Sequence, residues 1–327
     1  MSTNDGTSLN FSRFTRALLK IGSVLIGVIG GTGLYHLDNL TLIEAVNPST
    51  PWGYPSSPIN ICTLKSGTKV AFVARHGKHH DISPSTVPSR ANIAALKSLG
   101  VRAIIAFSSV GSLREEIVPG HVAIPTQIID RTKGVRPASF FDGTRVVAHA
   151  AFGDPFGMKL VQWLEAEVEK ALRQQGNGVV LHKDKCIICM EGPQFSTRAE
   201  SVMYRSWGAD LINMSVLPEA KLAREAEISY AMIASATDYD SWRSHSEAVT
   251  TTQVIETLKA NADIARHIAA SVLEDLHLAA VQGDILSEEK GSMKYSIMPS
   301  HGERNEEDVK KLAYILPEYF SPNEVAN

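Results

Sequence analysis

The chain has 327 residues, of which 44% are hydrophobic and 20% are charged, and its formal net charge at pH 7 is −3. This is the balance of an ordinary globular protein with a large core, and it gives no support to a nucleic-acid partner. Because no apolar run approaches the roughly 18 residues that a membrane-spanning helix needs, we expect no membrane contact.

We expect one domain, at residues 23–300, because no linker rich in proline, glycine or serine divides the chain. Residues 1–22 are polar, with few acidic side chains, and fit either a frayed terminus or a short basic targeting peptide. Residues 301–327 are predicted to form a charged C-terminal tail.

Three cysteines, Cys62, Cys186 and Cys189, fit a reducing compartment better than a disulfide framework. Two of them form a CxxC pair within KCIICM, a run that is typical of a strand. Residues three apart on a strand point to opposite faces, so we expect buried thiols and no metal site there.

The first apolar strand, Val24 to Ile29, runs into a glycine turn, IGGTGLY. Glycines let the backbone approach a ligand closely, and successive amides can hold an anion. The turn is not a dinucleotide fingerprint and lacks the lysine of a P-loop. Two interpretations stay open: a phosphate-binding turn to which Thr32 adds a hydroxyl, or a merely tight turn.

Arg75 and His76 follow the predicted strand Lys69 to Ala74. An arginine directly after a strand suits an oxyanion, with a surface salt bridge as the alternative. His76 and His80 have a spacing that would suit zinc on a helix. Neighbouring glycine and proline residues indicate a loop instead, and no acidic or cysteine ligand is near, so we expect no metal.

A predicted helix at residues 89–99 leads into the strand Arg102 to Phe107, after which come Ser108 and Ser109. Such small hydroxyl residues suit an anion or simply a turn. Further on, the long polar passage Arg131 to Pro155 predicts a functional loop or a subunit contact.

A helix from Gly157 to Gln175 is followed by a short strand and by EGPQFSTRAE, in which Thr197 and Glu200 predict a capping box. Phe195 lies just before that cap. It could stack on a flat ligand or act as a hydrophobic staple, and the spacing favours neither.

The segment from Gly208 to Trp242 predicts a buried strand, a short helix opened by Pro218, and a second apolar strand that ends in Asp-Tyr-Asp at 238–240. Near-continuous apolar runs separated by a helix predict an α/β fold whose sheet is covered on both faces. Since ligands gather at the carboxyl ends of such strands, we expect Ser215 and the two aspartates to face one crevice. A long helix, Thr252 to about Gln282, follows.

Several polar side chains therefore fall within a few residues after predicted strands: Thr32, Arg75, Ser108, Ser109, Ser215 and Asp238. Hydroxyls, an arginine and glycine amides are natural partners of phosphate. The pattern predicts a site that holds an oxyanion beside a group that needs an acid.

The sequence resembles the S-methyl-5'-thioadenosine phosphorylases of the trimeric purine nucleoside phosphorylase superfamily. The segments that carry the resemblance are IGVIGGTGLY, ARHGKHHDISPS, ANIAALKSLG, GSLREEIVPG, IDRTKGVRPASFFDG, EGPQFSTRAES, WGADLINMSVLPEAKLAREA and ATDYDSW. The resemblance implies a nucleoside phosphorylase-like fold, which is a single α/β domain with a twisted mixed β-sheet flanked by helices.

The resemblance also implies phosphate-dependent cleavage of methylthioadenosine to adenine and 5-methylthioribose 1-phosphate, in purine and methionine salvage. No metal or organic cofactor would take part. Inorganic phosphate would be a co-substrate. By matching motifs, phosphate would bind to Thr32, Arg75, His76, Ser108, Ser109 and Ser215. The substrate-binding set would be Phe195 on adenine, Met214 beneath the ribose, and Asp238, Tyr239 and Asp240.

Asp238 and Asp240 would be the catalytic pair and would read the N6 and N7 edge of adenine. Asp238 can donate a proton to N7 near neutral pH only if burial or its neighbour raises its pKa. Related enzymes for 6-oxopurines usually carry asparagine at this position, so an aspartate favours adenine.

Specificity would depend on Ser196, Thr251 and His149. His149 matches a histidine that the family lends across the subunit interface to the methylthio pocket, which implies a homotrimer. Thr251 falls where mammalian-type enzymes have an apolar residue near the 5' group. Its hydroxyl could relax the preference for methylthio, because one apolar contact is worth only about 1 to 3 kcal/mol.

Ser108 and Ser215 stand where the family often has threonine, a change that keeps the hydroxyl. The resemblance implies a cytoplasmic protein, with the nucleus left open as a second location. Two other functions also stay open: a broader-specificity purine nucleoside phosphorylase, and a non-catalytic nucleoside-binding protein on the same fold.

Overall fold

The computed structural model describes residues 24–30, 40–243, 251–299 and 304–320. Thr32 and the N-terminal extension predicted at residues 1–22 lie outside this part of the chain. The strands are β1 (Ile26–Gly30), β2 (Thr41–Val46), β3 (Ile59–Thr63), β4 (Lys69–Ala74), β5 (Ala103–Ser112), β6 (Val122–Asp130), β7 (Val147–Ala148), β8 (Leu181–Cys189), β9 (Leu211–Asn213), β10 (Ser229–Tyr239) and β11 (Ile297–Met298). The helices are η1 (Pro84–Thr86), α2 (Ser89–Ser98), α3 (Met158–Gln175), α4 (Arg198–Ser206), α5 (Val216–Glu225), α6 (Thr251–Gln282) and α7 (Glu306–Leu312).

Local sequence signals explain where most of these elements begin and end. Helix α3 buries its apolar positions along one face and ends at Gly176, whose positive φ of 65° places it in the left-handed region that favours glycine. Helix α4 begins with the predicted capping box: the Thr197 side chain accepts from the Glu200 amide, and the Glu200 carboxylate accepts from the Thr197 amide.

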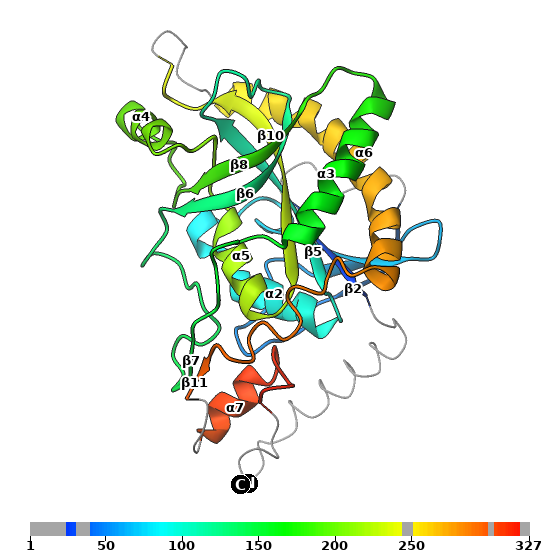
Figure 1. Ribbon diagram of the computed structural model, residues 1–327, viewed down its shortest axis with the longest axis vertical. Coiled ribbons are helices and arrows are strands. Elements are labelled where there is room, and N and C mark those ends of the chain that lie inside the picture. The colour runs from blue at the N-terminus through cyan, green and yellow to red at the C-terminus, as the bar shows by residue number, and fades with distance from the viewer. Residues whose placement is uncertain (1–23, 31–39, 244–250, 300–303, 321–327) are drawn as a thin grey trace.

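The strands form one mixed nine-stranded sheet in the order β10-β6-β8-β9-β5-β1-β4-β3-β2. Strand β10 also pairs with β5, in parallel, so that β5, β9, β8, β6 and β10 close into a ring. The predicted mixed sheet is confirmed, and the ring is an addition that periodicity does not reveal. The helices pack as pairs, α2 with α5 and α3 with α6 (Figure 1).

Strand β5 is longer than predicted and corrects one expectation. Ser108 and Ser109 were expected after a strand, but β5 continues through them to Ser112. Small polar residues have little strand preference of their own, so pairing decides. Here β10 runs beside β5 along this stretch, and β9 pairs with its last two residues.

The C-terminal segment contains order that its charged sequence hides. Asn305 caps α7 by accepting hydrogen bonds from two backbone amides, and the segment buries five apolar side chains in the main core: Val309, Leu312, Ile315, Leu316 and Phe320. Strand β11 pairs with β7 at the same end of the molecule (Figure 1). Residues 304–320 are therefore a packed part of the domain.

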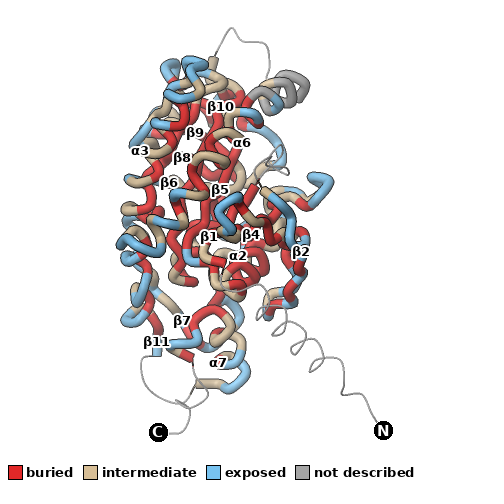
Figure 2. Tube along the Cα trace, turned by 90° about the vertical axis from the view of Figure 1, so that its right-hand side faces the viewer, coloured by how far each residue is buried: buried red, intermediate tan, exposed pale blue. Residues whose placement is uncertain are grey.

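The core follows the sheet, and exposure concentrates at its edge (Figure 2). Strands β1, β4 and β5 are almost wholly buried, whereas β2 exposes five of its six residues. Continuous apolar runs predict the first kind of strand, but β2 has a mixed sequence and was not predicted. Among the described residues, no helix has the length and apolar character to cross a membrane.

Candidate active site

Two predicted phosphate ligands, Ser108 and Ser215, lie side by side although 107 residues separate them in the chain. Ser108 lies in β5, Ser215 lies at the start of α5, and their hydroxyl oxygens are 3.1 Å apart. The Asn213 amide nitrogen donates to both oxygens, at 3.1 and 3.2 Å. An amide that donates to both hydroxyls fixes their oxygens, and sequence analysis did not identify it.

Arg75 is buried directly after β4 and is 2% exposed. Its Nε and Nη2 atoms donate to the two carboxylate oxygens of Glu219, at 2.5 and 3.1 Å. The remaining terminal nitrogen, Nη1, donates to the Phe107 carbonyl oxygen at 2.9 Å. The predicted oxyanion fork is therefore already engaged in a two-point ion pair, a geometry that is among the stronger ones for arginine.

Next along the chain, His76 uses its Nδ1 atom in a 2.9 Å hydrogen bond with the Ile82 carbonyl oxygen. Burial, helped by the neighbouring Arg75 guanidinium, lowers the pKa of His76 to about 4. The ring is thus neutral at physiological pH. The ring of His80, the second histidine of the spacing considered for zinc, lies tilted against it with ring centroids 4.6 Å apart.

A small pocket brings four of the predicted residues together: Arg75, His76, Met214 and Ser215. Gly192 fits closely against this site, since a Cβ atom there would lie 2.3 Å from the Met214 sulfur. No larger residue fits at that position without moving Met214. In the described part of the chain, no group of three or more histidine, cysteine, aspartate or glutamate side chains is arranged for a metal ion.

Arg136 also lines this pocket, and the sequence analysis did not select it. It is 7% exposed and comes from the long passage between β6 and α3, for which a functional loop or a subunit contact was predicted. Its guanidinium donates to the carbonyl oxygens of Met190, Glu191, Met214 and Leu217 and to the Ser85 hydroxyl. One side chain therefore joins the end of β8 to the start of α5.

The two predicted base-reading carboxylates lie together at the end of β10, against Gly111 of β5. A Cβ atom on Gly111 would lie 3.4 Å from the Asp240 Cβ and 3.5 Å from the Asp238 Oδ2 atom. The same atom would lie 2.9 Å from Ile212. Glycine is needed here because the carboxylates and the neighbouring strand approach so closely.

Burial raises the pKa of Asp238 to about 6. The Thr237 hydroxyl donates to the Asp238 carboxylate at 2.7 Å, which lowers the pKa, and the charge of Asp240 raises it. Burial also raises the pKa of Asp240, against the effect of the nearby Ser201 and Ser196 side chains. The Asp240 Oδ2 atom is buried and has no hydrogen-bond partner among the described residues. Two such carboxylates can share or donate a proton near neutral pH.

Strand β5 contacts both the serine pair and the aspartate pair. Ser108 contacts Ser215, and Gly111, three residues later, contacts Asp238 and Asp240. At about 3.3 Å per residue, the hydroxyl pair and the carboxylates are separated by roughly 10 Å along the strand. This is a span on the scale of one nucleoside.

The structure separates the two interpretations of Phe195. Thr197 is the N-cap of α4, so the position before the cap belongs to Ser196 and the fourth helical position to Ser201. A hydrophobic staple needs apolar residues at those two positions, and it is therefore not formed. Phe195 is 50% exposed, which leaves its ring available to a ligand.

The remaining predicted residues are placed as follows. Ser196 is buried, and its hydroxyl contacts the Met190 sulfur at 3.5 Å. The Tyr239 hydroxyl donates to the Glu115 carbonyl oxygen, and the Ser109 side chain is exposed. His149 is exposed after β7, and its amide donates to the Ser296 carbonyl oxygen. Thr251 begins α6, with its side chain outside the described residues.

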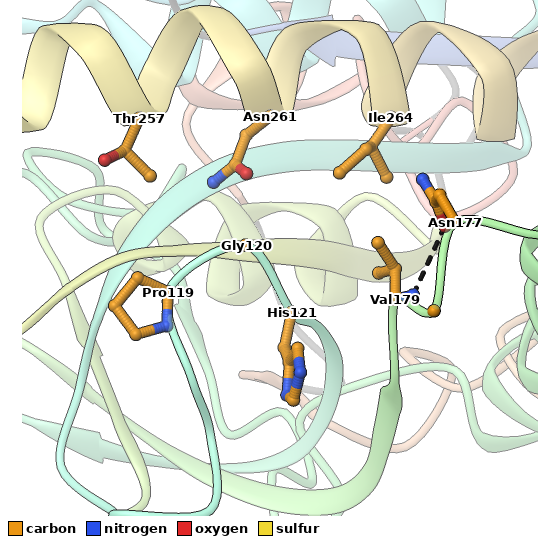
Figure 3. A pocket seen from close by; sticks show the side chains of 9 residues that line it. Pro119, Gly120, His121, Asn177, Val179, Thr257, Asn261 and Ile264 are labelled. Carbon is orange, nitrogen blue, oxygen red and sulfur yellow. Dashed lines mark hydrogen bonds between the residues drawn. The ribbon is translucent and has the colours of Figure 1, made fainter.

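A larger cavity of about 510 Å³ lies elsewhere, between α6 and the segments that precede β6 and β8 (Figure 3). Thr257, Asn261 and Ile264 point into it from α6. The Asn261 amide also donates to the Ala236 carbonyl oxygen, two residues before Asp238. None of the predicted site residues lines this cavity.

The sequence profile described as the phosphorylase superfamily matches residues 25–276. The chain belongs to the phosphorylase superfamily. Within the superfamily it is similar to S-methyl-5'-thioadenosine phosphorylase of Coprinopsis cinerea, with 63% identity that covers 91% of this chain and 98% of the relative. The enzyme of the same name from Candida albicans is 53% identical over 91% of this chain and 90% of its own length.

Solved superfamily structures agree with the fold. A methylthioadenosine phosphorylase from an antarctic soil metagenomic library has a TM-score of 0.81 and 39% identity, covering 90% of this chain and 99% of its own. The methylthioadenosine phosphorylase of Schistosoma mansoni, solved in complex with adenine, has a TM-score of 0.75 and 30% identity, covering 84% and 99%. The resemblance and the nucleoside phosphorylase-like fold are confirmed.

Proposed function

We propose that this protein cleaves S-methyl-5'-thioadenosine with inorganic phosphate, giving adenine and 5-methylthioribose 1-phosphate, and so serves purine and methionine salvage. The observation that carries the proposal is the arrangement along β5: Ser108 contacts Ser215, which lines a pocket with two arginines, and Gly111 lies against a buried carboxylate pair. The close relatives that bear the name of this enzyme support it.

In the proposed reaction, a phosphate oxygen forms a bond to the anomeric carbon of the sugar while the bond from that carbon to N9 of adenine breaks. The electron pair of the broken bond goes to the purine. Asp238 gives a proton to N7, so that adenine leaves as a neutral base. The transition state resembles an oxocarbenium ion. Phosphate that is already held in line with the breaking bond lowers the barrier, because the two reactants do not have to be brought together and oriented.

The phosphate would be bound by the full set that the resemblance implies: Thr32, Arg75, His76, Ser108, Ser109 and Ser215. The Asp240 Oδ2 atom, buried without a partner among the described residues, is available to accept a hydrogen bond from the adenine amino group. Phe195 would cover the base, and Met214 would lie under the ribose. No metal or organic cofactor takes part, so treatment with a chelator should leave the rate unchanged.

The deciding assay measures adenine release by the pure protein with and without phosphate. We expect release only with phosphate, together with an equal amount of 5-methylthioribose 1-phosphate. Release without phosphate would indicate a hydrolase, and no release would indicate a nucleoside-binding protein. Dominant cleavage of inosine over methylthioadenosine would favour a broader purine nucleoside phosphorylase.

We also infer a homotrimer, in which His149 of one subunit completes the methylthio pocket of the next. Its exposure on the β7 segment is compatible with such a contact. Light scattering should then give about three times the chain mass of 35.5 kDa. A cytoplasmic location, with or without a nuclear fraction, is part of the same proposal and can be tested with a fluorescent fusion.

A further inference from the structure

The pocket beside Ser215 is lined by two arginines, of which Arg75 was predicted to bind phosphate and Arg136 was not. Three basic side chains line this pocket: Arg75, His76 and Arg136. An anion responds to their net charge after each has been balanced by its own partners.

Arg75 has its counter-charge built into the fold. The Glu219 carboxylate accepts two hydrogen bonds from it, and the two side chains are only 3% and 2% exposed. The Tyr230 hydroxyl donates to the same carboxylate at 2.9 Å, which also stabilises its ionised form. To a ligand several ångströms away, this pair presents a dipole with no net charge.

His76 contributes no charge either. Its ring is buried against two guanidinium groups, and burial followed by the Arg75 charge lowers its pKa to about 4. A neutral ring can donate or accept one hydrogen bond, but it adds nothing to the net charge.

Arg136 is different because all of its partners are neutral. Its six hydrogen bonds go to four backbone carbonyl oxygens, the Ser85 hydroxyl and the sulfur of Cys189, a thiol whose pKa burial raises to about 12. Within the described part of the chain, no carboxylate oxygen lies within 4.0 Å of its guanidinium. The nearby Asp130 carboxylate is taken by Lys221. A buried cation without a counter-ion is costly unless a ligand supplies the missing charge.

We propose that Arg136 provides the net positive charge that holds the phosphate co-substrate, and that the bound phosphate is its counter-ion. The inference rests on the proposed function for the identity of the anion. Because the N–H groups of Arg136 are directed at protein oxygens and at the Cys189 sulfur, it acts through its charge.

A purely structural role makes a different prediction, and two substitutions separate the two roles. Arg136→Gln removes the charge and keeps an amide donor. Arg136→Lys keeps the charge but loses the planar fork that joins the carbonyl groups. If Arg136 were only a clamp, both variants would impair the site to a similar degree.

The experiment measures steady-state KM values for phosphate and for methylthioadenosine in both variants. We expect Arg136→Gln to raise KM for phosphate by about tenfold or more, with KM for the nucleoside changed by less than about threefold. Arg136→Lys should keep KM for phosphate within about threefold, even if its melting temperature falls. Lys133→Gln, an exposed change on the same loop, is the matched control and should alter neither constant.

Equal losses of phosphate affinity in the lysine and glutamine variants would overturn the inference, and so would an unchanged KM for phosphate in Arg136→Gln. Calorimetric titration with inorganic phosphate gives an answer independent of catalysis. If wild type binds phosphate and Arg136→Gln does not, the inference holds even when no adenine is released. If wild type releases adenine but the variants bind phosphate alike, only the inference fails.

Should Arg136→Gln not fold, weakened phosphate binding by a folded Arg136→Lys would still contradict the inference.

Discussion

At the residue scale, the surroundings of Asp238 favour its protonated form. It lies against a second acid, Asp240, and burial raises its pKa to about 6. A carboxylate can accept from the 6-amino group of adenine, and its acid form can donate to N7. An asparagine has nearly the same shape and can donate a hydrogen bond, but it has no acidic proton to transfer to N7.

We therefore expect Asp238→Asn to lower turnover of methylthioadenosine by about 100-fold, within the usual range for a lost general acid. Turnover of inosine should rise relative to that of methylthioadenosine, because the asparagine amide can donate to the 6-oxo group of inosine. Rates on both nucleosides, measured at saturating phosphate, test this. Unchanged rates on both would mean that Asp238 does not read the base.

The same residue should determine how the reaction depends on pH. Since the protonated form is the active one and its pKa is raised to about 6, kcat/KM for the nucleoside should fall as pH rises above about 6. In Asp238→Asn this fall should disappear, leaving a low and flatter profile. A wild-type profile that instead rises through pH 6 would require the ionised form and contradict the assignment.

At the element scale, the C-terminal end of α5 holds the long passage before α3 in place. The Glu225 carboxylate accepts a 2.7 Å hydrogen bond from the Phe140 amide, and Phe140 packs edge-on against Trp52. Burial raises the pKa of Glu225 from 4.5 to about 7. A carboxylate at the end of a helix is disfavoured by the helix dipole as well.

This acid should make the protein less stable as pH rises. The folded state holds the Glu225 proton more tightly than the unfolded state, so stability falls between about pH 4.5 and 7 and then levels off. The effect is about 3 kcal/mol over that window. Glu225→Gln, which keeps the acceptor, should remove this part of the slope in denaturant unfolding; parallel wild-type and variant curves would contradict it.

The elements also show what sequence reasoning could and could not find. The capping box at Thr197, the end of α3 and the extent of β4 depend on neighbours in the chain, and they were predicted correctly. Asn213, Glu219 and Arg136 were not selected, because their roles depend on distant partners. Arg75 and Glu219, for instance, are 144 residues apart. Only the folded chain brings such partners together.

At the scale of the whole molecule, the C-terminal segment belongs to the same core as the sheet. Leu312 of α7 is fully buried in that core, whereas Lys310 on the same helix is exposed. We expect Leu312→Ala to lower the free energy of unfolding by about 2 to 5 kcal/mol. Lys310→Ala should change it by less than about 0.5 kcal/mol. Equal small effects in urea unfolding would mean that this segment is not part of the cooperative unit.

Strand β5 passes through the interior with β1, β9 and β10 as its neighbours, and its last residues touch both functional groups. Because β5 is hydrogen-bonded to strands on both sides, we expect the distance along it between the phosphate site at Ser108 and the base site at Gly111 to stay fixed. We therefore expect a pyrimidine nucleoside, whose base has one ring and is shorter than adenine, to be a poor substrate because it would not span both groups.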